Sequence, residues 1–204
     1  MAEYLREAFG DAEYVTRDLS EADIPLIIGY WAGASDSWLE GLNVSRQRLG
    51  SEADMRARFS NMIRGVGDAD RVAFVTECNG DVMSYSNIHI VDNGAAAYLH
   101  GHVIRKDMRG KGVGSVRFSS MLRMIIDEFG VKTVIAEPLA SNVAVNRLHQ
   151  SYGLTPDRKW LDTPDGLAEP GWYNLYYFTR DVLDSADVRA TRARGLQKIE
   201  AGSA

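Results

Sequence analysis

The feature that most constrains the fold is a change of hydrophobic period around the stretch RGKGVG, residues 109–114. Before it, apolar and polar residues alternate over residues 71–104, as they do in half-buried strands. After it the period is about 3.6, with five apolar side chains on one helical stripe: Phe118, Met121, Leu122, Ile125 and Phe129. A stretch of six residues with three glycines and two basic residues therefore joins a strand to a helix. Such a junction presents unpaired N–H groups at a helix N-terminus, where an anion such as a phosphate is favoured.

Two earlier helices are indicated by the same start signature. Ser-Glu-Ala-Asp occurs at residues 20–23 and again at residues 51–54, as a serine N-cap followed three residues later by an acid. Pro25 predicts a late start or a kink in the first helix. The stretch between the two helices, residues 31–50, has little periodicity and predicts a loop or a broken helix.

The middle of the chain predicts an antiparallel meander. Asn79 and Gly80 separate two alternating runs and can both take the positive φ angles of a two-residue hairpin turn. Residues 92–94 turn the chain again into residues 96–104, and Gly130 ends the helix after the glycine turn. A buried strand, a short helix and a closing hairpin are expected further on, at residues 131–137, 141–152, 158–162 and 172–179.

Length and composition limit the possible classes of protein. The 204 residues predict one domain, with a core at about 14–180 and a polar C-terminal tail at 181–204. We expect the tail to be an exposed, fraying helix, or to pack on a partner subunit in a homodimer. A net charge of −5 disfavours a nucleic-acid partner, and no run approaches the ~20 apolar residues of a membrane span. The charged N-terminus shows no secretory signal, which predicts a cytoplasmic protein.

Cys78 is the only cysteine, which excludes an intrachain disulfide and a cysteine-rich metal site. A metal held by the scattered residues His100, His102 and His149 is not expected either.

The glycine turn does not match two better-known phosphate loops. A Walker A loop would end in Lys-Ser or Lys-Thr, and a dinucleotide fold would place the turn early in a βαβ unit. Here an antiparallel hairpin precedes the turn. The remaining alternatives are an anion cradle of another family, or simply a tight strand-to-helix connection.

Two motifs in this order resemble the GNAT superfamily of acyl-CoA-dependent N-acetyltransferases. The first, Arg or Gln, two residues, Gly, any residue, then Gly or Ala, matches Arg109, Gly112 and Gly114. The second matches NVAVNRLHQSYGL, through Asn142, Val145, Leu148 and Gly153. The resemblance spans about residues 14–180. It is nearest the ribosomal-protein and small-molecule branch, which begins with an R-x-L-x-x-x-D phrase, here Arg17 to Asp23.

The resemblance implies a fold and a co-substrate. The fold is α/β (α+β): a mixed, mostly antiparallel sheet of six to seven strands with splayed central strands, flanked by about four helices. The co-substrate is acetyl-CoA, with no metal. Its pantetheine arm would lie along the splayed strand at His102, Val103 and Ile104, with Asn142 on the other side. Its pyrophosphate would lie on the turn, which comprises Arg109, Gly110, Lys111, Gly112, Val113, Gly114 and Ser115.

Acetyl transfer to an amine needs a neutral nucleophile, a stabilised oxyanion and a proton for the leaving thiolate. His149 stands where the family usually has its acid tyrosine, and an imidazolium with a pKa near 6.5 could protonate the thiolate. Tyr152, or water, is the alternative acid. His100 is placed like a histidine that assists deprotonation in the arylalkylamine branch, and Glu77 is a competing base. Neither motif contains a cysteine, which favours direct attack in a ternary complex over a covalent intermediate.

Aromatic residues are candidates for the acceptor pocket: Trp31, Trp38, Tyr85, Trp172 and Tyr173. Each could instead be an ordinary core residue. Asp36 and Glu40 would suit a cationic amine. Bulky segments at 32–49 and 163–171 favour a narrow pocket for a small-molecule amine. The alternatives are a protein N-terminus or lysine as acceptor, and a non-catalytic acyl-CoA-binding module.

Overall fold

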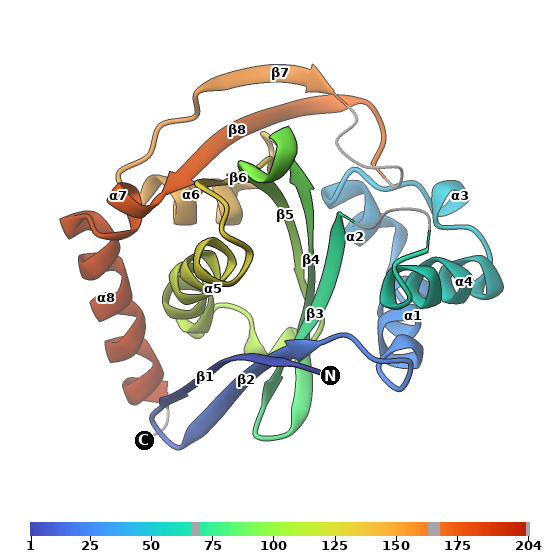
Figure 1. Ribbon diagram of the computed structural model, residues 1–204, viewed down its shortest axis with the longest axis horizontal. Helices are drawn as coiled ribbons and strands as arrows, with labels where there is room; N and C mark the ends of the chain where they lie inside the picture. Colours follow the sequence, from blue (N-terminus) through green and yellow to red (C-terminus); the bar gives the residue numbers. More distant parts are fainter. Residues whose placement is uncertain (67–69, 163–167, 203–204) are drawn as a thin grey trace.

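The computed structural model describes residues 1–66, 70–162 and 168–202 of the chain. Its centre is one eight-stranded sheet in the order β1-β2-β3-β4-β5-β6-β8-β7, shown in Figure 1. Among the strands of the described residues, only the β5–β6 pair is parallel. The strands are β1 (Glu3–Phe9), β2 (Ala12–Asp18), β3 (Arg71–Cys78), β4 (Asp81–Val91), β5 (Ala96–Val103), β6 (Thr133–Ala136), β7 (Arg158–Asp162) and β8 (Gly171–Thr179). The mixed, mostly antiparallel fold class is confirmed, with one strand more than the highest number expected.

Helices cover both faces of the sheet (Figure 1). The helices are α1 (Ile24–Ala32), α2 (Asp36–Gly41), α3 (Arg46–Leu49), α4 (Glu52–Ile63), α5 (Val113–Phe129), α6 (Val143–Gln150), α7 (Arg180–Leu183) and α8 (Ala186–Gly202). Helices α1 and α4 bury apolar side chains against β3 and β4, including Val75 and Tyr85. Helix α5 buries Leu122 and Ile125 on the opposite face. We call these the α1 face and the α5 face.

Both helix-start signatures form hydrogen-bonded turns, but only one becomes the full cap. Ser51 and Asp54 form a reciprocal capping box at the start of α4. Ser20 donates to Asp23 in the same way, at 2.6 Å from its hydroxyl and 2.9 Å from its amide. Helix α1 nevertheless starts later, with Asp23 as its N-cap and Pro25 in its first turn, because proline fits where no amide donor is needed.

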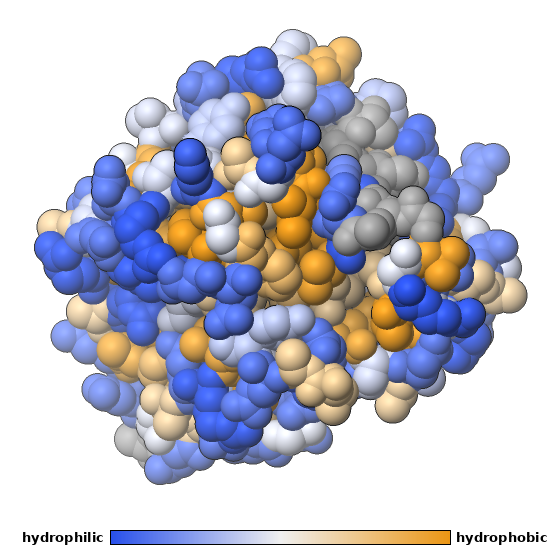
Figure 2. Space-filling model, viewed as in Figure 1, coloured by the Kyte–Doolittle hydropathy of each residue, from blue (hydrophilic) through white to orange (hydrophobic). Residues whose placement is uncertain are grey.

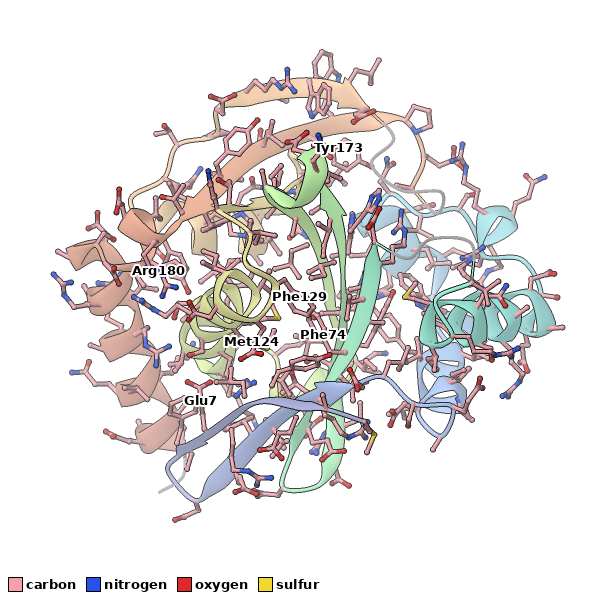
Figure 3. All side chains as sticks on the ribbon, in the orientation of Figure 1. Glu7, Phe74, Met124, Phe129, Tyr173 and Arg180 are labelled. Carbon is pink, nitrogen blue, oxygen red and sulfur yellow. The ribbon has the colours of Figure 1, made fainter. Side chains whose placement is uncertain are left out.

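The meander is also as expected. The β3–β4 hairpin turns at Asn79 and Gly80, whose φ angles are 52° and 85°. Phe74 of β3 and Met124 and Phe129 of α5 point toward one another between helix and sheet (Figure 3). On the side of the molecule that Figure 2 shows, hydrophobic residues gather in a hollow at the centre, within a largely hydrophilic rim. Within the described residues, no helix is both long and apolar enough to cross a membrane.

Both ends of the chain differ from the expectation. Strand β1 precedes the expected core and adds an edge to the sheet. The expectation of an exposed tail is wrong for residues 186–202, because α8 packs on α5 and β1 of its own chain. Val188 is 1% and Ile199 8% exposed. The polar sequence did not predict this contact, because α8 buries few apolar side chains. Its other contacts with α5 are made by Gly195 and Arg192.

Candidate active site

The two parallel strands at the centre of the sheet pair only at their beginnings. The β5–β6 pairs are Ala96 with Thr133, Ala97 with Val134, and Tyr98 with Ile135. Strand β6 then ends at Ala136, while β5 continues along β4 to Val103. The edge of β5 from Leu99 to Val103 therefore has no strand partner within the described ranges. This is the splay that the resemblance implied.

The backbone that faces the splay can be assigned from the alternation of an antiparallel ladder. The amide of Ile104 donates to the carbonyl of Met83 in β4, at 2.8 Å. Every second residue of β5 therefore turns its amide and carbonyl away from β4, which selects Leu99, Gly101 and Val103. His102 and Ile104, expected to bind the pantetheine arm, face β4 with their backbones. The backbone of Val103 faces the splay, where its carbonyl accepts from Arg109.

The glycine turn leaves a row of amides exposed at the start of α5. Gly112 is the N-cap of α5 with φ 88°, a left-handed angle that suits glycine. The amides of residues 110–114 donate to no acceptor in the described part of the chain. Gly110, Lys111 and Gly114 are exposed, whereas the side chain of Val113 is buried in the core. The turn thus has the unpaired donors that an anion requires, supplied by backbone rather than side chains.

Arg109, the first residue of the motif, turns back from these amides. Its guanidinium donates to the Val103 carbonyl at 2.7 and 3.2 Å. It also lies 4.1 Å from the centre of the Trp38 ring, in a cation–π contact. Arg109 therefore joins the turn to the end of β5 and to α2.

An aromatic cluster surrounds His102 on the α1 face. The His102 ring stacks on Tyr85 with centroids 5.5 Å apart, and meets Trp31 edge-on at 4.8 Å. Tyr30 lies beside it, with its hydroxyl 3.4 Å from the imidazole Nδ1, and accepts a hydrogen bond from Trp38 Nε1. The predicted acceptor residues Trp31, Trp38 and Tyr85 are thus brought together. Trp31 and Tyr85 are buried, whereas Tyr30, Trp38 and His102 are partly exposed.

The other acceptor candidates lie elsewhere or have partners. Trp172 is 55% exposed and carries the Lys159 ammonium over its ring. Tyr173 is buried and accepts a hydrogen bond from Asn43 Nδ2 at 3.0 Å. Asp36 is paired with Arg46 at 2.9 Å. Glu40 is exposed.

Glu137 is a functional candidate that the sequence reasoning missed. It directly follows β6, and the β5–β6 register extended by two residues from Tyr98–Ile135 would set His100 opposite it on the same face. Burial raises the pKa of the Glu137 carboxyl, which accepts a hydrogen bond from Trp160 Nε1. Burial and then the Glu137 charge raise the pKa of Tyr98. A carboxyl of raised pKa and a histidine thus flank the splay. The available signal was an acid at the carboxyl end of a buried strand.

Glu77, predicted as a competing base, has a partner two strands away from the splay. Its carboxylate lies 2.5 Å from the Arg17 guanidinium, which also contacts Asp23 at 2.8 Å. Their exposed side-chain fractions are 20%, 15% and 7%. The Arg17-to-Asp23 phrase therefore forms an ion triad that ties β2 and β3 to the start of α1. The geometry does not favour Glu77 as a base.

His149 does not have the environment of an acid. It is 1% exposed, and its ring lies among Phe118, Tyr176 and Phe178, with centroids 4.7 to 5.2 Å away. Its Nδ1 is buried with no partner in the described residues. Burial lowers the pKa of His149 to about 4. The expectation that His149 acts as an imidazolium with a pKa near 6.5 does not fit this environment, in which the ring is neutral at pH 7.

The other α6 candidates have structural contacts. Asn142 is the N-cap of α6, and its Oδ1 accepts from the Val145 amide at 3.3 Å. Tyr152 is buried and donates its hydroxyl to the Ser115 carbonyl at 3.1 Å. Burial raises the pKa of Tyr152 to about 12. Tyr152 thus fastens the end of α6 to the first turn of α5.

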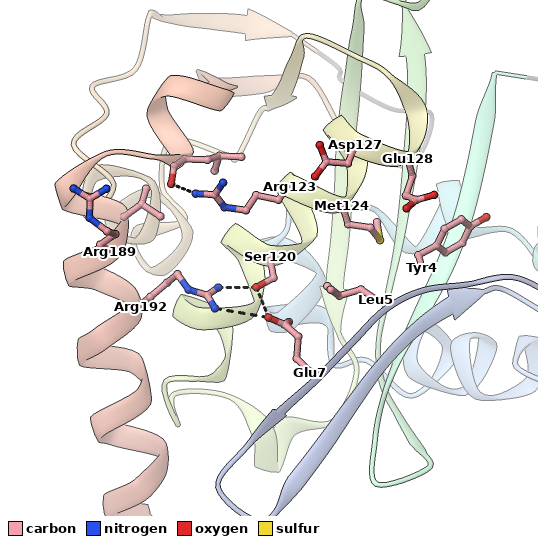
Figure 4. A pocket seen from close by; sticks show the side chains of 12 residues that line it. Tyr4, Leu5, Glu7, Ser120, Arg123, Met124, Asp127, Glu128, Arg189 and Arg192 are labelled. Carbon is pink, nitrogen blue, oxygen red and sulfur yellow. Dashed lines mark hydrogen bonds and ion pairs between the residues drawn. The ribbon is translucent and has the colours of Figure 1, made fainter.

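A pocket of about 470 Å³ lies between β1, α5 and α8 (Figure 4). None of the predicted site residues lines it. Several of its charged side chains pair with one another or with neighbours, as in Arg123–Asp184 at 2.7 Å and Arg192–Glu7 at 3.7 Å. No three His, Cys, Asp or Glu side chains of the described residues gather as a metal site. The splay and the turn therefore remain the candidate active site.

Comparison with known proteins identifies the class. The acetyltransferase (GNAT) family model matches residues 35–154. No curated protein matches the chain. Among solved structures, Mycobacterium smegmatis RimJ in complex with CoA-disulfide has a TM-score of 0.72 at 14% identity, covering 96% of this chain and 98% of that one.

Two further structures share the fold. RimL, a ribosomal L7/L12 alpha-N-protein acetyltransferase in complex with coenzyme A, has a TM-score of 0.70 at 14% identity, covering 89% of this chain and 99% of that one. Aminoglycoside acetyltransferase AAC(6')-Ib, in complex with coenzyme A and kanamycin, has a TM-score of 0.66 at 14% identity, with coverage of 84% and 97%. The chain belongs to the acetyltransferase (GNAT) family. It is an N-acetyltransferase, so the non-catalytic alternative is set aside.

Proposed function

We propose that this enzyme transfers an acetyl group from acetyl-CoA to the primary amine of a small molecule, by direct attack in a ternary complex. The observation that carries the choice of acceptor is a set of hydrogen bonds over the α1 face. Val44 forms a bridge with Ala168, and the Glu169 amide donates to the Asn43 carbonyl at 2.7 Å. Arg48 donates to the Ala168 carbonyl at 2.8 Å.

These bonds join the α2–α3 segment to the chain that leads into β8. The α2–α3 segment belongs to the α1 face, whereas β8 lies beyond β6, on the other side of the splay. The connection therefore crosses the acceptor side of the splay. It leaves room for a small amine more readily than for a folded polypeptide. Residues 163–167 of the predicted bulky segment lie outside the described residues.

The residues present fit acetyl-CoA. The unpaired amides of residues 110–114 would hold the diphosphate, with Lys111 adding charge. The backbone of Gly101 and the amide of Val103 would hydrogen-bond the pantetheine arm, because the Val103 carbonyl already accepts from Arg109. Asn142 keeps its side-chain nitrogen for the other side of the arm. The RimJ, RimL and AAC(6')-Ib structures contain coenzyme A or its disulfide, which supports this co-substrate.

Glu137 and His100 are our proposed route for the proton. An amine with a pKa of about 10.4 must lose a proton, which costs on the order of 4.6 kcal/mol at pH 7. Glu137 would accept that proton, with His100 across the splay. After the amine attacks the thioester carbonyl, the nitrogen still carries a surplus proton. That proton leaves with the thiolate as the C–S bond breaks, so the reaction balances with water as the relay and without His149 or Tyr152 as acid.

A thiol-release assay tests the proposal. Acetyl-CoA is offered with polyamines, aminoglycosides, amino acids and peptides with a free N-terminus. We expect turnover with a small amine and not with peptides. Turnover with peptides alone would instead favour the protein-amine alternative, for which the likeness to RimL is the supporting observation. Turnover with neither class would contradict the proposed acceptors.

A further inference from the structure

The C-terminal helix α8 rests against the back of the glycine turn. It lies beside α5 (Figure 1), and its contacts with the turn and α5 extend from Gly112 to Ser120. The closest approach involves two glycines, Gly195 of α8 and Gly112 of the turn. A Cβ at Gly112 would lie 2.6 Å from the Gly195 carbonyl oxygen. A Cβ at Gly195 would lie 2.7 Å from Val116 Cγ2 and 3.1 Å from the Gly112 carbonyl oxygen. The two backbones therefore meet with no room for a side chain between them.

Polar contacts fix the position of α8 along α5. Arg192 donates to the Val116 carbonyl at 2.7 Å, and to the hydroxyls of Ser119 and Ser120 at 2.8 and 2.6 Å. The Ser120 contact, with Glu7 beside it, can be followed in Figure 4. Ser119 is fully buried. Arg192 therefore holds α8 at one height on the first turns of α5.

The same helix also contacts the end of α6. Thr191 donates to the Ser151 carbonyl at 2.7 Å. A Cβ at Gly153, whose φ is 79°, would collide with the Asp187 carboxylate. Gly112 of the first motif and Gly153 of the second thus both lie in close contact with α8, whereas a Cβ at Gly114 would meet nothing within 4 Å.

We infer that α8 positions the acetyl-CoA site, with Gly195 and Arg192 as its positioning residues. The turn has left-handed backbone and amides without internal partners, so its own hydrogen bonds do not hold its shape. Helix α8 supports the turn through the close contact of Gly195 with Gly112. The amides of residues 110–114 still have no acceptor in the described residues. This inference rests on the proposed placement of the diphosphate at the turn. Displacing α8 weakens the grip on the diphosphate without touching the acceptor.

The test is Gly195→Ala, with Gly29→Ala as its matched control. Alanine is the better helix former, so an α8 without this close contact would tolerate or gain from the change. Gly29 lies in helix α1, and a Cβ there meets nothing within 4 Å. We expect the KM for acetyl-CoA to rise about tenfold or more in Gly195→Ala, because a small displacement of a binding group has a large effect. The acceptor KM, and both parameters of Gly29→Ala, stay at wild-type values.

S-acetylpantetheine, which lacks the diphosphate, separates this role from a general loss of structure. Its kcat/KM stays within about twofold in Gly195→Ala if α8 acts through the diphosphate site. An equal loss with both acyl donors, or an unchanged acetyl-CoA KM, overturns the inference. Wild-type enzyme that used both donors equally well would overturn the diphosphate site itself, and with it any support for that site.

Arg192→Gln provides a second variant that adds no bulk, in case Gly195→Ala does not fold. It removes the donors to Val116, Ser119 and Ser120 and leaves the glycine contact intact. We expect the acetyl-CoA KM to rise about three- to tenfold, again with S-acetylpantetheine kcat/KM preserved. A folded Arg192→Gln enzyme with wild-type acetyl-CoA KM contradicts a positioning role for α8.

Discussion

The glycine turn and the acceptor side of the splay are built in opposite ways. The turn is made of backbone: the left-handed angle of Gly112 and the free amides of residues 110–114 lie within six consecutive letters of sequence. The proposed acceptor side is made of side chains from distant elements, such as Trp38, His102 and Glu137. A backbone site is therefore encoded locally, whereas a side-chain site depends on register and packing. Substitutions at the turn should lower acetyl-CoA affinity, whereas substitutions at the acceptor side should lower kcat.

The largest effect is expected at the turn, from Gly112→Val. A Cβ there meets the Gly195 carbonyl oxygen at 2.6 Å, and valine disfavours φ 88°. We expect acetyl-CoA affinity to fall by more than about 100-fold, measured by calorimetry.

Gly65→Val is the control for backbone strain alone. Gly65 has φ 64°, but a Cβ there meets nothing within 4 Å. It should lose roughly 1–2 kcal/mol of stability and keep its acetyl-CoA affinity. Normal acetyl-CoA binding by Gly112→Val would mean that the turn is only a tight connection.

At the acceptor side of the splay, Glu137→Gln should lower kcat by roughly 100- to 1000-fold, since a positioned base contributes that much. Acetyl-CoA affinity should be unchanged. The raised pKa of Glu137 also predicts the acidic limb of the pH–rate profile. The base must be ionised, so activity falls as the pH drops through a value above the ordinary carboxyl range.

Glu77→Gln is the matched variant. It weakens the contact with Arg17 and should cost roughly 1–3 kcal/mol in urea unfolding, with kcat changed less than about threefold. The reverse pattern, with kcat lost in Glu77→Gln and kept in Glu137→Gln, would identify Glu77 as the base.

The same contrast explains how much could be predicted from the sequence. The change of period, the turn at Asn79 and Gly80 and the cap at Ser51 are local, and the structure has them where expected. Glu137 was missed because its proposed place opposite His100 depends on extending the parallel register of β5 and β6 by two residues. Helix α8 was misjudged because only a few of its apolar side chains, such as Val188 and Ile199, are buried. Its remaining contacts with α5 come from Gly195 and Arg192, neither of which adds to hydrophobic periodicity.

His149 gives an intermediate effect, on stability rather than rate. Burial lowers its pKa from 6.5 to about 4, so the folded state favours the neutral ring. The contribution of the neutral His149 ring to the free energy of unfolding is fully present above pH 6.5. It is lost as the pH falls toward 4, by about 3 kcal/mol in total. His149→Phe keeps an aromatic ring beside Phe118 and should remove this part of the pH dependence. Urea unfolding between pH 4 and 8 measures the difference, and a large loss of kcat in this variant would restore His149 as the acid.

The smallest effect is expected from Tyr152→Phe. This variant tests whether a residue predicted as a catalytic acid instead supports the glycine turn. The Tyr152 hydroxyl donates to the Ser115 carbonyl behind the turn, and burial raises its pKa to about 12. Losing one hydrogen bond there should cost about 1 kcal/mol of stability and leave kcat within about threefold of wild type. A hydroxyl that instead protonated the leaving thiolate would lower kcat by about 100-fold or more when removed. Measuring kcat and urea unfolding on the same preparation distinguishes a residue that fastens the backbone site from one that takes part in the chemistry.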